Sequence, residues 1–192
     1  MSRQEQHWAG EGGNAYHARQ TVHEVNRVPF WEAILKQIDP DSILDIGCAE
    51  GWNQRAIKIV DPDLSTMGID INVGALAKAR EAGLTVSLCR AIDVADQFGN
   101  ACADLVVHSG VLIHVPPEDF PATTRAIYDA ANRYVLCIEY EGEREEEIEY
   151  RGERGLLWKR PWGVIYEELG MTVIMHGPAV GYDRCMFWLL RK

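Results

Sequence analysis

The stretch from Ser42 to Asn53 constrains the fold more than any other part of this chain. A short apolar run ends on a carboxylate, Asp45, passes through a turn that contains Gly47, and enters a helical pattern. Gly47 lets the backbone turn sharply and leaves no Cβ between the peptide and a ligand above it. Open α/β sheets bind their ligands at the carboxyl ends of the strands. The sequence therefore predicts a strand–loop–helix unit with a ligand over the loop.

The spacing within this loop distinguishes two kinds of nucleotide site. A dinucleotide fingerprint reads G-x-G-x-x-G after the strand, whereas the order here is Asp-x-Gly-x-x-x-Gly. In this respect the chain resembles the class I S-adenosylmethionine-dependent methyltransferases, whose first motif reads roughly D/E-x-G-x-G-x-G. Ala49 stands where that motif usually has its middle glycine. The resemblance implies that the methionine and ribose part of the cofactor is held by Asp45, Gly47, Cys48, Ala49 and Gly51.

An acidic residue at the end of the second strand is the next piece expected of such a site. Asp70, followed by Ile71, ends an apolar run about 20 residues after Gly51, the separation expected of an α/β nucleoside site. We expect Asp70 to bind the ribose hydroxyls, with Ile71 beside it. The alternative is a Rossmann-type fold that binds another ligand, such as the nicotinamide or flavin cofactor of an oxidoreductase.

The loop after the third strand is expected to bind the adenine. Class I methyltransferases carry an acidic residue and a backbone amide at this place, and Asp93 and Val94 match them. Asp93 is the first candidate for the exocyclic amine of the adenine, and Asp96 is the second. The alternative for Asp93 is that it caps a loop turn.

The pattern along the whole chain predicts an α/β fold. The first strand is expected to begin at residue 42, and the second to end at residue 70. Further strands are expected at 85–88, 104–108, 134–139, 172–176 and 185–190. Helices are expected at 52–60, at 72–81 with Asn72 as N-cap, at about 117–132 and at 161–169. Residues 21–38 also have helical spacing, and we expect Pro29 to split them into a short turn and a helix. The last two strands are joined without a helix, which indicates an antiparallel hairpin at the sheet edge. We expect a Rossmann-like class I methyltransferase fold: a seven-stranded, mostly parallel sheet of order 3-2-1-4-5-7-6 with helices on both faces.

Residues 1–20 are polar and rich in glycine, and two interpretations are open. Such a composition usually means a disordered tail, but Trp8, Tyr16 and Arg19 are unusual in a tail. We expect a lid segment at 1–20 that folds over the cofactor, followed by a single methyltransferase domain at 21–192.

Composition narrows the class of partner. The formal net charge of −10 argues against a nucleic-acid binder, which needs a basic footprint. No apolar run is long enough for a transmembrane helix, and the polar N-terminus lacks the apolar core of a signal peptide. The five cysteines are scattered, which fits reduced thiols. We expect a cytoplasmic monomer or homodimer that acts on a small molecule and does not associate with membranes.

Two histidines after the fourth strand are the candidate catalytic residues. Methyl transfer mainly requires donor and acceptor to be aligned, but a hydroxyl or ammonium acceptor must also lose a proton, and histidine suits that task. His108 and His114 are the candidate bases. The alternative is that they only shape the cofactor pocket, and we also expect His108 to contact the cofactor. The loop lacks the Asp/Asn-Pro-Pro-aromatic signature of amino-methylating DNA enzymes, so nucleobase methylation is disfavoured.

A charged segment follows the fifth strand. Its glutamates are expected to form a solvated face, the alternative being a divalent-metal or amine-binding patch; we expect no metal site. The basic residues after them could receive an anionic substrate or pair with the glutamates. The glutamates are Glu143, Glu145, Glu146, Glu147 and Glu149, and the basic residues are Arg151, Arg154, Lys159 and Arg160.

A closer resemblance covers nearly the whole chain. Residues 8–19, 110–115 and 132–160 look like the methylases associated with pseudaminic acid biosynthesis, which accompany genes for nine-carbon acidic sugars. The resemblance implies Tyr16 and Arg19 as cofactor contacts. It also implies substrate contacts at Trp8, Glu139, Tyr140, Tyr150, Arg151 and Lys159.

These observations predict an S-adenosylmethionine-dependent methyltransferase that acts on a small polar or anionic metabolite, such as an acidic or nucleotide-activated sugar. The alternatives are a protein or nucleic-acid methyltransferase and a non-catalytic protein that only binds S-adenosylmethionine.

Overall fold

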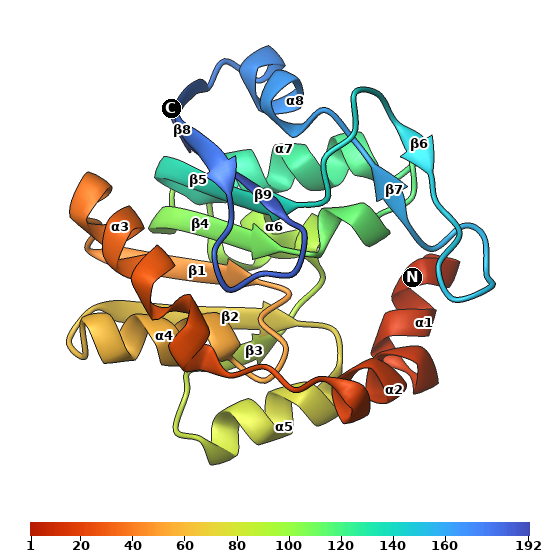
Figure 1. The fold of residues 1–192 in the computed structure, drawn as a ribbon, viewed down its shortest axis with the longest axis horizontal. Coiled ribbons are helices and arrows are strands. Elements are labelled where there is room, and N and C mark those ends of the chain that lie inside the picture. Colours follow the sequence, from red (N-terminus) through yellow and green to blue (C-terminus); the bar gives the residue numbers. More distant parts are fainter.

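The computed structural model describes residues 1–192 and contains a seven-stranded sheet flanked by helices (Figure 1). The strand order is β3-β2-β1-β4-β5-β9-β8, so the predicted fold class and order are confirmed. The strands of this sheet are β1 (Ser42–Ile46), β2 (Ser65–Asp70), β3 (Val86–Leu88), β4 (Ala103–Ser109), β5 (Ala131–Glu139), β8 (Thr172–Pro178) and β9 (Met186–Arg191). All pairs are parallel except β5–β9 and β8–β9, which form the predicted antiparallel edge.

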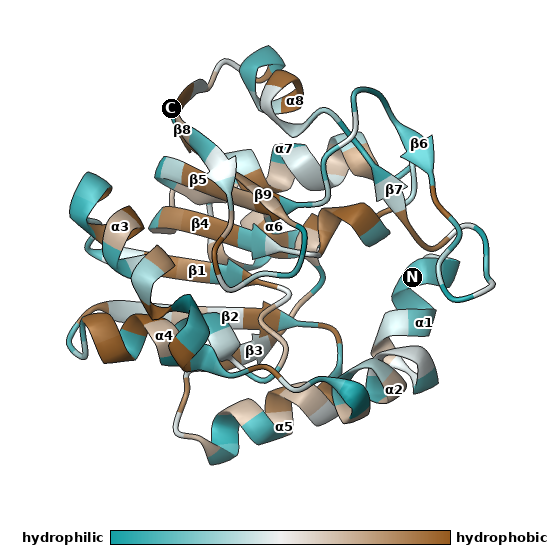
Figure 2. Cartoon of the chain, viewed as in Figure 1, coloured by the Kyte–Doolittle hydropathy of each residue, from teal (hydrophilic) through white to brown (hydrophobic).

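Helices cover the two faces of the sheet with separate apolar clusters. Side chains of α3 (Val28–Ile38) and α4 (Trp52–Val60) pack on one face. Side chains of α6 (Val94–Phe98), α7 (Phe120–Ala130) and α8 (Trp162–Glu168) pack on the other. The central strands are apolar along most of their length (Figure 2), because a strand covered on both faces has no solvent side. No helix has the length and apolarity that crossing a lipid bilayer requires.

The predicted local signals form as expected in three helical segments. Helix α4 has the predicted bounds, and α5 (Val73–Glu81) is capped by the Asn72 side chain, which accepts from the backbone N–H of Ala75 at 2.9 Å. The segment around Pro29 is divided as predicted into a short turn, the helix η1 (Glu24–Arg27), and the longer helix α3. Pro29 lies in the first turn of α3, where a missing N–H costs no hydrogen bond.

Two segments lie beside the carboxyl ends of the parallel strands (Figure 1). The first 20 residues form α1 (Arg3–Ala9) and α2 (Glu11–Arg19). The charged segment forms a small second sheet from β6 (Glu146–Glu147) and β7 (Trp158–Lys159). The loops after the strands carry two more short helices, η2 (Ala91–Asp93) and η3 (Leu112–His114).

Candidate active site

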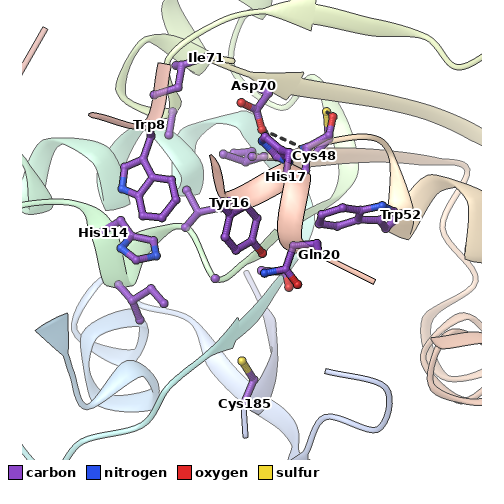
Figure 3. A pocket seen from close by; sticks show the side chains of 18 of the residues that line it. Trp8, Tyr16, His17, Gln20, Cys48, Trp52, Asp70, Ile71, His114 and Cys185 are labelled. Carbon is purple, nitrogen blue, oxygen red and sulfur yellow. Dashed lines mark hydrogen bonds between the residues drawn. The ribbon is translucent and has the colours of Figure 1, made fainter. Parts of the chain in front are cut away.

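A cavity of about 590 Å³ lies at the carboxyl edge of the sheet. Its wall combines the loops after β1, β2 and β4 with the first residue after β5, the loop between β8 and β9, and the N-terminal helices. In Figure 3, Tyr16 stands between Trp8 and His114 on one side and Trp52 on the other. The volume is that of a site for one or two small molecules.

The loop after β1 forms the floor of the cavity through its backbone. Gly47 has a φ of 66°, and a Cβ there would lie 2.3 Å from Cγ2 of Val111, so only glycine fits. Ala49 also has a positive φ, 53°, and its N–H donates to Oδ2 of Asp70 at 2.8 Å. The structure thus brings Gly47, Cys48, Ala49, Asp70 and Ile71 together on the wall, as predicted.

Gly51 does not line the cavity. Its φ of 78° turns the chain into α4, and a Cβ would lie 2.1 Å from Cδ1 of Leu84. Its place in the motif therefore reflects the turn, and the geometry gives it no direct contact with a ligand.

Asp45 is fully buried beneath the same loop. Its Oδ1 accepts from Nδ2 of Asn53 at 3.1 Å, while Oδ2 has no partner. Burial raises the pKa of Asp45 to about 7, although the bond from Asn53 opposes this shift. Asp45 does not itself line the cavity. A buried acceptor without a partner beneath a loop that Gly47 leaves without a Cβ fits a cofactor that carries an ammonium group, as S-adenosylmethionine does.

The geometry does not support the predicted adenine contacts. The Asp93 side chain lies outside the cavity and pairs with Arg90 at 3.2 Å, and Val94 is buried in the apolar core. Asp96 is also outside the cavity. The wall at this place consists of Cys89, Ala91 and Ile92.

His108 is removed from the candidate bases by its position. It is fully buried and away from the cavity, with Nδ1 2.8 Å from Oε1 of Glu139 and Nε2 2.7 Å from the hydroxyl of Tyr166. Glu139 is equally buried, and its Oε1 also accepts from the N–H groups of Val111 and Leu112. Glu139 therefore holds the loop after β4 in place and does not reach a substrate.

His114 does line the cavity. Its Nδ1 lies against the carbonyl oxygen of Leu156, which can only accept, so Nδ1 carries the proton and Nε2 is left as a free acceptor. Burial lowers the pKa of His114 to about 4, so the ring is neutral at pH 7. The ring centroid of Trp8 is 4.2 Å away and that of Tyr150 is 5.5 Å away.

The remaining predicted residues fall into two groups. Trp8, Tyr16, Arg19, Tyr140, Tyr150 and Arg151 line the cavity. Lys159 does not; it lies in β7, opposite Glu146. Arg160, a further candidate for anion binding, is buried and held by Glu145 and by the carbonyls of Leu112 and Val115, so its donors are used within the protein.

Helices α1 and α2 are attached to both sides of the cavity. On the β2 side, Nδ2 of Asn72 donates to the carbonyl of Trp8 and to Oδ1 of Asn14. On the side of the charged segment, Arg19 donates to the hydroxyl of Tyr150 at 2.9 Å, and Gln4 to the carbonyl of Gly155.

Sequence reasoning missed several residues of the wall. They come mostly from the segment before α3 and from the β8–β9 loop. They include His17, Gln20, His23, Asn26, Arg27, Trp52, Asn53, Tyr182, Asp183 and Cys185. The signal was available for the second group: β8 is parallel to β5, so the loop that follows β8 must lie at the carboxyl edge.

Comparisons with known proteins agree with this arrangement. Residues 43–133, slightly less than half of the chain, match the family described as a methyltransferase domain. No curated protein sequence matches the chain.

Solved structures share the fold at low sequence identity. Magnesium protoporphyrin IX methyltransferase from Synechocystis, with bound S-adenosylmethionine, is 13% identical, has a TM-score of 0.70, and aligns over 100% of this chain and 98% of its own. The 1,6-didemethyltoxoflavin-N1-methyltransferase of Burkholderia thailandensis, with bound S-adenosylhomocysteine, is 14% identical, with a TM-score of 0.69 and coverage of 94% and 82%. A sugar N-methyltransferase from Streptoalloteichus is 13% identical, with a TM-score of 0.69 and coverage of 96% and 94%.

Proposed function

We propose that this chain, a class I S-adenosylmethionine-dependent methyltransferase, methylates a small polar or anionic metabolite in the cavity beneath α1 and α2. The observation that carries the proposal is His114, a neutral histidine with a free Nε2 on the wall of the cavity.

The donor half of the site is assigned to the loop after β1 and the end of β2. The floor formed by Gly47, Cys48 and Ala49 would hold the cofactor, and Asp70 and Ile71 lie on the same wall. Asp45, buried beneath this floor, would favour the positively charged ammonium group without lining the cavity. When bound, S-adenosylmethionine supplies a methyl group on a positively charged sulfur.

The acceptor half contains the proposed base. Nε2 of His114 would take up the proton that the acceptor loses: a hydroxyl would lose it as its oxygen is methylated, and an ammonium group would lose it first, so that the nitrogen regains its lone pair. The methyl group would come from bound S-adenosylmethionine, leaving S-adenosylhomocysteine, and the proton would remain on the imidazolium of His114. The low pKa of His114 keeps the base form present at every pH above about 4, so its ionisation produces no step in the rate between pH 6 and 8.

Three guanidinium groups support an anionic acceptor. Arg19, Arg27 and Arg151 line the cavity and have no carboxylate within 4.0 Å, in a chain whose net charge is −10. An acidic or nucleotide-activated sugar would meet these groups with its carboxylate or phosphate. The shared fold with a sugar N-methyltransferase is in keeping with this substrate class.

Residues 1–20 are proposed to act as the lid of the site. Trp8, Tyr16 and Arg19 reach the cavity from α1 and α2, and closure over the ligands would exclude water. A cytoplasmic setting is part of the proposal and is supported by the five free cysteines.

The first experiment tests the cofactor and the base separately. Isothermal titration calorimetry measures the Kd of S-adenosylhomocysteine, and transfer of labelled methyl is measured on a panel of sugar acids, their nucleotide conjugates and neutral sugars. His114→Gln is expected to lower kcat on the acceptor found by about 100-fold or more and to leave the Kd within a factor of three. His176→Gln, an exposed histidine away from the cavity, is the matched control.

Two results would contradict the proposal. Absence of S-adenosylhomocysteine binding removes the cofactor assignment, and an unchanged rate in His114→Gln removes the base. Binding without transfer to any member of the panel or to macromolecules would favour the non-catalytic alternative.

A further inference from the structure

Trp8 is the residue of the lid that lies directly against the candidate base. Its ring centroid is 4.2 Å from that of His114, and the two ring planes are tilted by 46°. Figure 3 shows the two rings next to each other on the wall of the cavity. A side chain from the first helix therefore belongs to the immediate surroundings of a residue that lies far along the chain.

Three neighbours enclose the imidazole of His114. Trp8 comes from α1, while Tyr150 and Leu156 come from the charged segment. The ring of Tyr150 is 5.5 Å from His114 and 5.9 Å from Trp8, and the carbonyl oxygen of Leu156 accepts from Nδ1 of His114. Of these neighbours only Trp8 belongs to the lid, so the enclosure of the base is complete only when α1 is in place.

Polar contacts hold α1 in this position. The carbonyl of Trp8 accepts from Nδ2 of Asn72 at 3.1 Å, and the carboxylate of Glu5 pairs with Arg90 at 2.7 Å. Neither apolar core cluster contains a residue before Val28. The lid can therefore move away from the cavity without disrupting the core, and Trp8 moves with it.

The charge of His114 depends on how much water reaches its ring, because an imidazolium is stabilised by hydration. The titratable and charged groups on the elements around the ring are Glu5 and His7 of α1, Tyr150 and Arg151 of the charged segment, and Glu139 and Arg160 behind the loop. Burial is the main cause that lowers the pKa of His114 to about 4; the bond to Leu156 and the charge of Glu139 oppose it, and His7 adds to it. Enclosure therefore outweighs the charges around the ring.

A tryptophan face also attracts a cation, and this attraction by itself would favour the imidazolium. It is small beside the hydration that the imidazolium loses when its ring is enclosed on several sides. Trp8 therefore favours the neutral form of His114. Without this cover the pKa would return toward the ordinary value of 6.5, at which about one quarter of the rings are protonated at pH 7 and cannot accept a proton.

We propose that Trp8 is a positioning residue of the methyl transfer: its indole covers the imidazole of His114 when α1 is closed, and the exclusion of water keeps Nε2 free to accept a proton. The assignment rests on the proposed function, because it takes His114 to be the base. It ties proton uptake to the closed lid, so that the acceptor gives up its proton only after the site has been shut from water.

The test follows the imidazole signals of the full chain by ¹H–¹³C spectra between pH 8.5 and pH 5.5. The chain has six histidines, and the signal of His114 is identified by its loss in His114→Gln. In the unmodified chain this signal should not titrate over the range. In Trp8→Ala it should titrate with a midpoint between about 5.5 and 6.5.

Two further variants show whether the aromatic ring itself is responsible. Trp8→Phe keeps a ring on α1, so its midpoint should lie below that of Trp8→Ala. Gln6→Ala is the matched control, because Gln6 is exposed on the same helix and does not line the cavity; its His114 signal should stay untitrated. Unchanged amide signals of β4 and β5 would show that the sheet is intact in each variant.

Kinetics separate this role from simple packing of the lid. On the acceptor found with the panel, kcat of Trp8→Ala should fall about tenfold for each pH unit below the new midpoint. The unmodified chain should show no such fall. A side chain that only packs the lid would lower the rate by the same factor at every pH.

The outcomes distinguish the two proposals. An unchanged rate in His114→Gln would contradict the proposed function, whatever the titration shows. A His114 signal that stays untitrated in Trp8→Ala, that titrates equally in Gln6→Ala, or that has the same midpoint in Trp8→Phe and Trp8→Ala would overturn the role of Trp8 alone.

Discussion

At the scale of single residues, the site combines groups whose local environments are unfavourable. Ala49 adopts a positive φ that glycine tolerates better, and the buried Asp45 keeps one oxygen without a partner. Both lie in or beside the loop that forms the floor of the cavity. Such strain is typical of positions kept for binding a ligand at a cost in stability.

Asp45 yields a prediction about pH and stability. Its pKa is about 7 in the folded protein against an ordinary value of 3.8, so between these values the folded state binds a proton that the unfolded chain has released. Its contribution to stability is therefore complete below about pH 3.8 and is lost as pH rises through about 7. Asp45→Asn should remove this loss. Between pH 5 and pH 8, the free energy of unfolding of the unmodified chain should therefore fall by about 2 kcal/mol more than that of Asp45→Asn.

Urea denaturation at the two pH values measures this difference, and Asp63→Asn, a change at an exposed aspartate, is the control. The same Asp45→Asn variant should bind S-adenosylhomocysteine more weakly, because the free carboxylate oxygen is gone. An unchanged pH dependence of stability would show that Asp45 ionises as an ordinary carboxylate.

At the scale of elements, the loop after β4 is held from behind by buried charges. Glu139, from the end of β5, receives two backbone N–H groups of this loop and the ring of His108. Arg160 binds the carbonyls of Leu112 and Val115 from the other direction. The position of His114 in the cavity therefore depends on charges that never touch a ligand.

Glu139→Gln is expected to destabilise the fold by about 3 kcal/mol, because a neutral amide removes the anion that three donors share in a buried site. Thermal or urea unfolding measures this loss, with Glu146→Gln, an exposed glutamate of β6, as the control. If Glu139 instead bound substrate, as the family resemblance implies, the variant would keep its stability and raise KM.

At the scale of the whole molecule, two segments far apart in the chain meet over the cavity. Helices α1 and α2 contact the β6–β7 segment through pairs such as Arg19–Tyr150 and Gln4–Gly155 (Figure 1). Neither apolar core cluster contains a residue before Val28. The N-terminal helices are thus attached mainly by polar contacts and by aromatic rings that line the cavity.

Hydrogen exchange should detect this arrangement. Amides of residues 3–19 are expected to exchange quickly in the free protein and to slow at least tenfold when S-adenosylhomocysteine saturates the site, because the ligand adds contacts to Trp8 and Tyr16. Amides of β4 and β5 in the sheet centre should change little. Equal exchange of residues 3–19 with and without ligand would contradict the lid.

The order of the strands was predictable because it depends on local signals. Each of these signals depends on a few neighbouring residues in the sequence. They are the apolar runs, the turn at Gly47, the cap at Asn72 and the absence of a helix between the last two strands. The floor of the donor half follows from the same signals, since Gly47, Ala49 and Asp70 sit where adjacent parallel strands end. Outside that floor, the position of a residue in a family motif did not predict whether it lines the cavity. His108 is buried away from the cavity, and Asp93 pairs with Arg90 outside it.

The sequence by itself therefore determined the α/β fold and the floor of the donor half, because backbone turns and strand ends are local properties. Only the tertiary structure decided the rest of the cavity, including the proposed acceptor half. It buried His108 and Glu139 behind the loop, left Nε2 of His114 without a protein partner, and brought Arg27 against Tyr182 across 155 positions of the chain. The physical reason is that a side chain's partners and solvent exposure depend on which distant segments pack against it.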